Sequence, residues 1–151
     1  GKAAKQVVTY CIRNDIGILI VGYNTTFQRS SDLGRQPNQI FAGIPFGILR
    51  RKLKYLCEMN GIRYVEQEES YTSMASFWDL DEMPVYGEAG FVPPVFSGRR
   101  ICRGLYQDRS GRRINADVNG ALNIMRKCNI VSLRALYARG DVDTPVRIRI
   151  A

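Results

Sequence analysis

The sequence predicts an α/β fold built on a parallel sheet. A run of apolar residues with helical spacing at residues 3–12 is followed by a continuous apolar run at 16–23. The same order recurs at 45–61 and 62–67, and helices that alternate with buried strands are typical of parallel crossover units. With 151 residues, 45% of them hydrophobic, the chain is long enough for one globular domain with a core.

The bounds of the first two helix–strand pairs follow from local sequence signals. The first helix is expected to end near residues 14–15, and the strand at 16–23 reads as buried on both faces. The polar segment 24–43 predicts a long loop. Pro45 opens the second helix at a first helical position, and the pair Asn60–Gly61 ends it.

Three acids lie at the carboxyl end of the second strand, where α/β sheets bind ligands. On a strand, Glu66 and Glu68 share one face while Glu69 points the other way. One interpretation is a ligand site, and the other is an acidic strand end in water. Residues 74–98 are irregular and aromatic, 99–106 predict a strand, and 108–113 predict a turn.

The segment 114–124 (I-N-A-D-V-N-G-A-L-N-I) begins the last long helix, expected over 117–129. Its apolar stripe contains Val118 and Leu122, whereas Asn119 and Asn123 fall on the opposite face. Asp117 lies at the edge of the apolar stripe. It is either a helix-start acid favoured by capping and the helix dipole, or a metal-binding carboxylate. The tail, 131–151, holds a short helical piece at 133–139 and a basic extended run at 146–150.

Charge is unevenly distributed along the chain. The formal net charge is +8, yet residues 64–98 hold seven acids and no Lys or Arg, whereas residues 99–113 hold six arginines and one acid. This arrangement suits a phosphate-binding surface beside a metal site. The alternative is an ordinary solvated surface. The candidate nucleic-acid contacts in this arginine-rich segment are Arg99, Arg100, Arg103, Arg112 and Arg113.

Cysteine and histidine usage argues against zinc. The four cysteines form no C-x-x-C pair and histidine is absent, so the closely spaced ligands of a structural zinc site are missing. Cys11, Cys57 and Cys128 read as core residues on helices. No apolar run reaches membrane-spanning length and no signal peptide opens the chain, which predicts no membrane partner and an intracellular, cytoplasmic location.

Three stretches resemble the C-terminal part of OrfB/TnpB-type transposon proteins, which are relatives of type V CRISPR effectors. They are I-V-G-Y-N at 20–24, E-E-S-Y-T-S at 68–73 and the segment 114–124, which corresponds to the family's D-x-N-A-A-x-N-I helix. The resemblance implies an RNase H-like (RuvC) fold and a DNA nuclease guided by RNA. It also implies a carboxylate triad that holds two Mg²⁺ ions, with Asp117 as the last acid, and a prokaryotic, nucleoid-associated protein.

The sequence departs from this family in three places. The family's first acid lies in a G-I-D-x-G strand that the chain does not contain, so the chain looks like a fragment without its N-terminal strands. The middle acid's usual place holds Val21 and Gly22, and by resemblance Glu69, or alternatively Glu68, replaces it. The family's four-cysteine ribbon is lost, so no zinc is expected.

These observations predict a partial RuvC-like domain with an irregular insertion. Its first part is 1–73, the insertion 74–113 replaces the ribbon, 114–130 is the catalytic helix, and 131–151 is the tail. The expected function is the nuclease portion of a transposon-encoded, RNA-guided DNA endonuclease with Mg²⁺ as cofactor and DNA and guide RNA as partners. It is active only if the missing strand is supplied. The alternative is a non-catalytic nucleic-acid-binding fragment or transposon relic. The sequence sets no oligomeric state.

Overall fold

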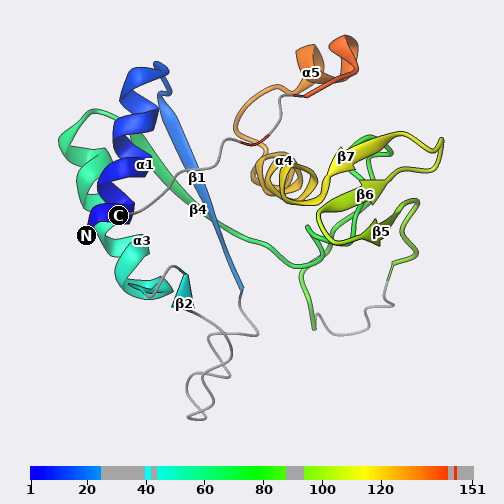
Figure 1. The fold of residues 1–151 in the computed structure, drawn as a ribbon, viewed down its shortest axis with the longest axis horizontal. Coiled ribbons are helices and arrows are strands. Elements are labelled where there is room, and N and C mark those ends of the chain that lie inside the picture. Colours follow the sequence, from blue (N-terminus) through cyan, green and yellow to red (C-terminus); the bar gives the residue numbers. More distant parts are fainter. Residues whose placement is uncertain (25–39, 42–43, 88–93, 143–144, 146–151) are drawn as a thin grey trace. The chain divides into compact units, whose positions relative to one another are not determined.

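The computed structural model describes residues 1–24, 40–41, 44–87, 94–142 and 145, which form two compact units (Figure 1). The first unit holds residues 1–21 and the described part of 26–66. The second holds residues 22–24 and the described part of 67–146. Both contain helix and strand, which confirms a mixed α/β fold. The predicted loop at 24–43 and the predicted basic run at 146–150 fall almost wholly outside the described residues.

Two helices form the core of the first unit. Helix α1 spans Lys2–Arg13 and α3 spans Phe46–Met59, and the two lie side by side (Figure 1). Their apolar stripes meet in one buried cluster, as the helical spacing predicted, and Cys11 and Cys57 are part of it. Pro45 immediately precedes α3, in the short strand β3 (Ile44–Pro45), which pairs antiparallel with β2 (Ile40–Phe41).

Strands β1 (Ile18–Tyr23) and β4 (Arg63–Glu68) are paired. They run parallel, because the Arg63 N–H donates to the Gly17 carbonyl at 2.9 Å and the Glu69 N–H donates to the Tyr23 carbonyl at 2.9 Å. Each strand begins in the first unit and ends in the second. The expectation that β1 is buried on both faces was wrong: all six of its residues are half-buried.

The second unit contains a three-stranded antiparallel sheet of β5 (Arg99–Cys102), β6 (Leu105–Gln107) and β7 (Arg113–Asn115), with β6 in the centre (Figure 1). The single strand predicted at 99–106 is a tight hairpin. The chain reverses at Gly104, whose φ of +81° is open to glycine at little cost. The predicted turn at 108–113 is confirmed, and the Asp108 carboxylate accepts from the Arg112 N–H at 2.7 Å within it.

Helices α4 (Ala116–Cys128) and α5 (Arg134–Arg139) complete the second unit. Tyr106, Ile114 and Ala116 form a small buried core. The described part of 74–98 holds no helix or strand, as predicted. Phe77 anchors this segment by stacking on Tyr137 of α5, with ring centroids 4.6 Å apart.

Two further observations concern the chain as a whole. The four cysteines are free thiols, with Cys11 and Cys57 buried, Cys128 half-buried and Cys102 exposed on β5. Among the helices that the structure describes, none is long and apolar enough to cross a membrane.

Candidate functional site

The Glu69 carboxylate lies against the backbone of Gly22, at the end of β1. A Cβ atom added to Gly22 would be 2.5 Å from Glu69 Oε2 and 2.7 Å from Ile124 Cδ1 of α4. No real Cβ tolerates such distances, so only glycine fits at this position while Glu69 and Ile124 keep their places. The Glu69 carboxylate therefore fills the space that a side chain at position 22 would occupy.

Glu68 is held differently from its neighbour. Its carboxylate forms an ion pair with Lys127 of α4, and both side chains are about nine-tenths buried, at 11% and 10% exposed. It also accepts from the Ser70 N–H at 3.0 Å. Burial alone would raise the pKa of the Glu68 carboxyl, but hydrogen bonds from Lys127 and Ser70 outweigh it and hold the pKa below its ordinary value. Glu68 is thus an ionised structural acid with a fixed cation beside it.

Asp117 occupies the first turn of α4 and is exposed. The helix cap is Asn115, whose Oδ1 accepts from the Asp117 N–H at 2.9 Å and the Val118 N–H at 3.1 Å. The Asp117 carboxylate is therefore not needed to cap the helix, although the helix dipole still favours it there. Asp117 precedes Ile124 by seven residues, close to two turns, so both lie on one face of α4.

Two buried asparagines of α4 hold the segment that follows Glu69. Asn119 Nδ2 donates to the Ala75 carbonyl at 2.9 Å, and its Oδ1 accepts from the Phe77 N–H at 3.0 Å. Asn123 Nδ2 donates to the Thr72 and Ala75 carbonyls at 2.9 and 2.8 Å. Both side chains are 0% exposed, so this face of α4 is an interior face and not a solvent face. The amide groups replace main-chain partners for a segment that lacks regular structure.

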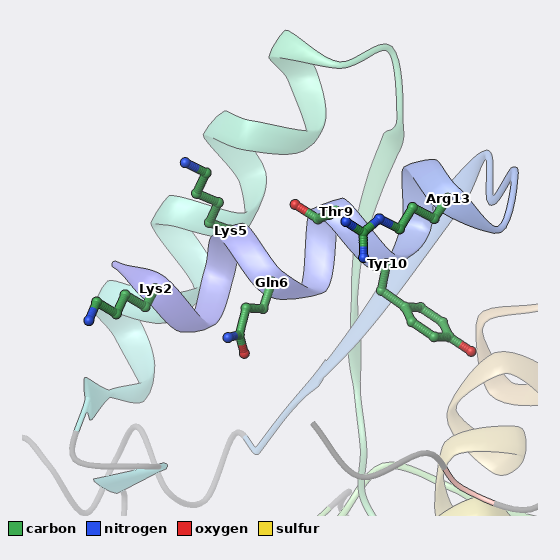
Figure 2. Close-up of a pocket in the computed structure, with 6 residues that line it drawn as sticks. All are labelled: Lys2, Lys5, Gln6, Thr9, Tyr10 and Arg13. Atoms are coloured by element: carbon green, nitrogen blue, oxygen red, sulfur yellow. The ribbon is translucent and has the colours of Figure 1, made fainter. Parts of the chain in front are cut away.

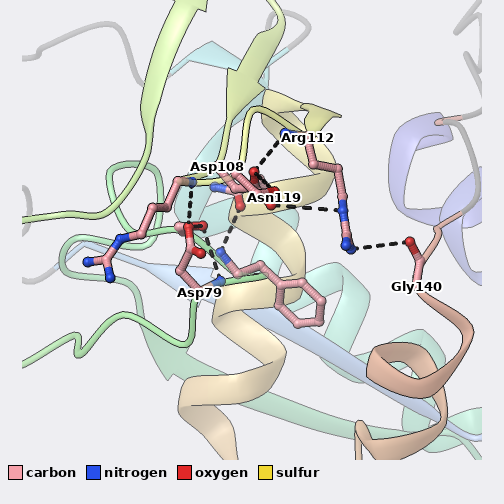
Figure 3. Close-up of polar contacts among 9 residues, drawn as sticks. Asp79, Asp108, Arg112, Asn119 and Gly140 are labelled. Atoms are coloured by element: carbon pink, nitrogen blue, oxygen red, sulfur yellow. Dashed lines mark hydrogen bonds and ion pairs between the residues drawn. The ribbon is translucent and has the colours of Figure 1, made fainter.

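Two acids, the buried Asp81 and the half-buried Asp79, organise the irregular segment itself. Asp81 accepts from the Ser76 N–H at 2.8 Å, the Ser97 N–H at 2.9 Å and the Ser97 hydroxyl at 2.6 Å. Asp79 accepts from the Ser76 hydroxyl at 2.7 Å and the Arg109 N–H at 2.9 Å (Figure 3). These carboxylates join residue 76 to residue 97 across the segment. Asp79 and Asp81, which belong to the acidic stretch at residues 64–98, therefore stabilise the fold of this segment.

The candidate arginines lie on or beside the three-stranded sheet, and all five are exposed. Arg99 and Arg113 are both paired with Gln107 of the central strand. Residues directly opposite one another share a sheet face, so Arg99 and Arg113 flank Gln107 on one face, about 10 Å apart. Arg103 lies in the hairpin turn. Arg99 and Arg100 also line a pocket of about 420 Å³ together with Phe96 and Tyr106.

Arg112 has structural partners in place. Its guanidinium carbon lies 4.7 Å from the centre of the Trp78 ring, and its NH1 donates to the Gly140 carbonyl at 3.3 Å (Figure 3). Its Nε also lies 3.9 Å from the Asp108 carboxylate. Arg112 therefore has a structural role among the five arginines: it contacts Trp78, Gly140 and Asp108 of the protein itself.

Several residues of this region were not singled out from the sequence. Lys127 looks like an ordinary basic residue near a helix end, and Gln107 like an ordinary strand residue. The N-A-D-V-N-G-A-L-N pattern did carry a signal, since asparagine recurs four residues apart at 115, 119 and 123. That spacing puts all three amides on one helix face. Among the described residues, no three or more His, Cys, Asp or Glu side chains gather as a metal site.

Comparison with known families identifies the class of protein. Residues 46–124, more than half of the chain, match the family described as Cas12f1-like, TNB domain, and the chain belongs to this family. The family is TnpB/Cas12-related and is one of RNA-guided nucleases, with nucleic-acid binding as its general property. No curated protein matches the chain.

Proposed function

We propose that the chain is the C-terminal nuclease portion of a transposon-encoded, RNA-guided DNA endonuclease, with Asp117 and Glu69 as metal ligands. The observation that carries the proposal is the Glu69 carboxylate in the space beside Gly22. Relatives are expected to carry an acid at the position of Val21 or Gly22. Here a carboxylate reaches that place from the neighbouring strand, so the chemical group is kept although its sequence position has changed.

The surroundings of the two glutamates favour Glu69 over Glu68 as the ligand. Glu68 already has a buried cation beside it, and a metal ion there would have to displace Lys127 or lie next to it. The Glu69 carboxylate, in contrast, lies beside Gly22 at the end of β1, the place at which relatives are expected to carry the acid. Helical side chains lean toward the N-terminus, so the Ile124 tip beside Glu69 lies toward the turn that carries Asp117.

The donor chemistry fits Mg²⁺. Asp117 and Glu69 offer only carboxylate oxygens, the hard ligands that this ion prefers. When bound, the metal would supply charge stabilisation at the scissile phosphate and an activated water. Two carboxylates are fewer than the triad implied by the resemblance, and the 151 residues contain no G-I-D-x-G segment. We therefore propose that the first acid comes from a strand outside these residues, as part of an RNase H-like sheet that includes β1 and β4.

The exposed arginines of the sheet supply the nucleic-acid contacts in this proposal. Arg99 and Arg113 would contact successive phosphates across one face, with Arg100 and Arg103 nearby and Arg112 as a positioning residue for the loop. DNA and a guide RNA are the proposed partners. The insertion 74–113 would then present this surface, in place of a zinc ribbon and without zinc.

The test is cleavage and metal binding with four variants. With the strand that carries the first acid supplied, we expect Mg²⁺- or Mn²⁺-dependent cutting of labelled single-stranded DNA, lost in Asp117→Ala and Glu69→Gln and retained in Glu68→Gln. Mn²⁺ binding by electron paramagnetic resonance reports the site even where cleavage is weak. The triple variant Gly22→Glu with Glu69→Ala and Ile124→Val removes the two groups that a Cβ at position 22 would meet, returns the carboxylate to β1 and should restore the Mn²⁺ binding lost in Glu69→Gln. Equal Mn²⁺ binding by wild type, Asp117→Ala and Glu69→Gln would contradict the assignment.

A second function, nucleic-acid binding without catalysis, is favoured by one observation. In the part of the chain that the structure describes, no three potential metal ligands gather. This function predicts salt-sensitive binding to DNA or RNA with no cutting under any metal condition. The same cleavage assay separates it from the nuclease.

A further inference from the structure

Helix α1 carries a basic face on the side opposite its contact with α3. Its opposite face is buried against α3 through small apolar residues such as Ala4 and Val8. Along the basic face, six side chains line a groove of about 490 Å³ (Figure 2): Lys2, Lys5, Gln6, Thr9, Tyr10 and Arg13. Their spacing is that of one helix face, and from Lys2 to Arg13, eleven helical steps, the face extends about 16 Å.

Helices α1 and α3 carry a large excess of positive charge. Helix α1 contains no acidic residue, and α3 adds four further cations against the single acid Glu58. One of the four, Arg50, is paired with Glu66, whereas Arg51, Lys52 and Lys54 are exposed. Two adjacent helices with this balance create a positive potential that attracts a polyanion.

An aromatic ring lies within the same face. Tyr10 is 39% exposed, and it lies one turn before Arg13 and one turn after Gln6. Cations that flank an exposed ring are the combination with which proteins bind single-stranded nucleic acid, because phosphates contact the charges and a base stacks on the ring. An acidic protein surface could pair with the cations, but it offers no flat base that would stack on the Tyr10 ring.

We propose that the basic face of α1 binds a single-stranded nucleic-acid segment. Lys2, Lys5 and Arg13 would contact its phosphates, and Tyr10 would stack against one base. This goes beyond the proposed nuclease function, since the face belongs to the first unit and involves neither the candidate metal ligands nor the arginines of the sheet. The binding needs no metal ion.

The test measures binding of fluorescein-labelled dT20 to the whole chain by anisotropy, in EDTA and over a series of KCl concentrations. In Lys5→Gln with Arg13→Gln, we expect at least tenfold weaker binding at 0.1 M KCl. The slope of log K against log salt should fall by about 1.4, because each phosphate contact on a single strand contributes about 0.7. Tyr10→Ala should weaken binding about tenfold and Tyr10→Phe should leave it near wild type.

A matched control distinguishes the effect of this face from a general effect of net charge on nucleic-acid binding. Arg63→Gln with Arg134→Gln removes two exposed cations elsewhere, on β4 and α5, and should change affinity less than twofold. Circular dichroism checks that each variant is folded. Equal losses in the two double variants, unchanged binding after Lys5→Gln with Arg13→Gln, or competition by poly-glutamate as strong as by dT20 would overturn the proposal. Loss of cleavage alone, with these affinities intact, would contradict only the nuclease proposal.

Discussion

The side-chain amide of Asn123 lies 2.8 Å from the carbonyl oxygen of Ala75, to which it donates a hydrogen bond. This contact connects the middle of α4 to the segment that leaves β4, 48 residues earlier in the chain. Asn119 makes the equivalent contact one turn earlier, at 2.9 Å. The helix that begins with Asp117 is thus tied by two buried amides to the segment that begins with Glu69.

Replacing Asn123 with Leu should destabilise the second unit by about 2–4 kcal/mol, because in a site that excludes water the Thr72 carbonyl loses the amide donor of Asn123 and the Ala75 carbonyl keeps only that of Asn119. Chemical denaturation followed by the fluorescence of Trp78, the single tryptophan, reports on this unit. Asn14→Ala, followed by circular dichroism because Asn14 lies in the first unit, is the control: Asn14 also donates to a main-chain carbonyl but is exposed, and its loss should cost less than about 1 kcal/mol. Similar losses in both variants would contradict the role given to Asn123.

Acid should weaken the second unit through Glu68. Its pKa in the folded protein lies below the ordinary value, so its stabilising contribution is complete above the unfolded pKa of about 4.3. The contribution is lost as the pH falls through the lower folded pKa. Glu68→Gln should be less stable than wild type at pH 7, with the difference shrinking below pH 4. Melting temperatures between pH 7 and pH 3 check this.

Glu82→Gln provides the control for Glu68, because Glu82 is an exposed acid of the same unit. It should change the melting temperature little at any pH. Lys127→Met leaves the Glu68 carboxylate buried without its cation and should cost about 3–5 kcal/mol at pH 7. A melting temperature that falls equally with pH in wild type and Glu68→Gln would contradict the assignment.

Asp81→Asn should loosen the irregular segment. The carboxylate accepts from two main-chain N–H groups and one hydroxyl, and an amide nitrogen in its place would face donors with a donor. We expect a loss of about 2–4 kcal/mol in the second unit and faster proteolysis of the segment around residues 76–97. Asp141→Asn, at a carboxylate that is 77% exposed, should have little effect on either measurement.

Chelation should leave the melting temperature of the second unit unchanged, because hydrogen bonds of Asp79 and Asp81 hold the segment and no zinc is expected there. Metal analysis of the purified protein should find less than about 0.1 equivalent of zinc, a threshold chosen against the full occupancy of structural zinc sites. A fall in melting temperature with EDTA that is reversed by Zn²⁺ would contradict this.

Gly22→Ala should displace the Glu69 carboxylate, because the new methyl group and Glu69 Oε2 cannot occupy the same space. If Glu69 binds metal, Mn²⁺ affinity should fall at least tenfold, the loss typical when a ligand's orientation is disturbed. Gly17→Ala is the matched control, since a Cβ at Gly17 meets no atom within 4 Å. Unchanged Mn²⁺ affinity in Gly22→Ala would contradict the role of Glu69.

The long elements were predictable because their apolar periodicity is strong. Helices α1 and α3 and the strand that follows each were predicted to within a few residues, with Gly61 ending the second helix at a φ of +70°. The hairpin at Gly104 was not, because two short strands with a tight turn have the same apolar composition as one longer strand. Strand length alone does not show where a chain reverses.

The polar face of α4 shows why pattern alone was insufficient for the site. Asn119 and Asn123 look like solvent residues in the sequence, because asparagine is usually exposed, but here unpaired carbonyls of the preceding segment give them partners in the interior. The same limit applies to Glu68, whose partner Lys127 lies 59 residues away. The proximity of Glu69 to Gly22 also depends on strand pairing, which the sequence predicted only as a parallel arrangement.

The two asparagines bind main-chain groups of the segment and not its side chains. Asn123 contacts only the main-chain oxygen atoms of Thr72 and Ala75. These hydrogen bonds do not depend on which side chains stand between them, at Ser73 and Met74. This stretch can accumulate substitutions without moving either candidate acid. A change at position 73 or 74 therefore leaves these hydrogen bonds intact, whereas a change at position 119 or 123 removes hydrogen bonds that hold the segment to the helix.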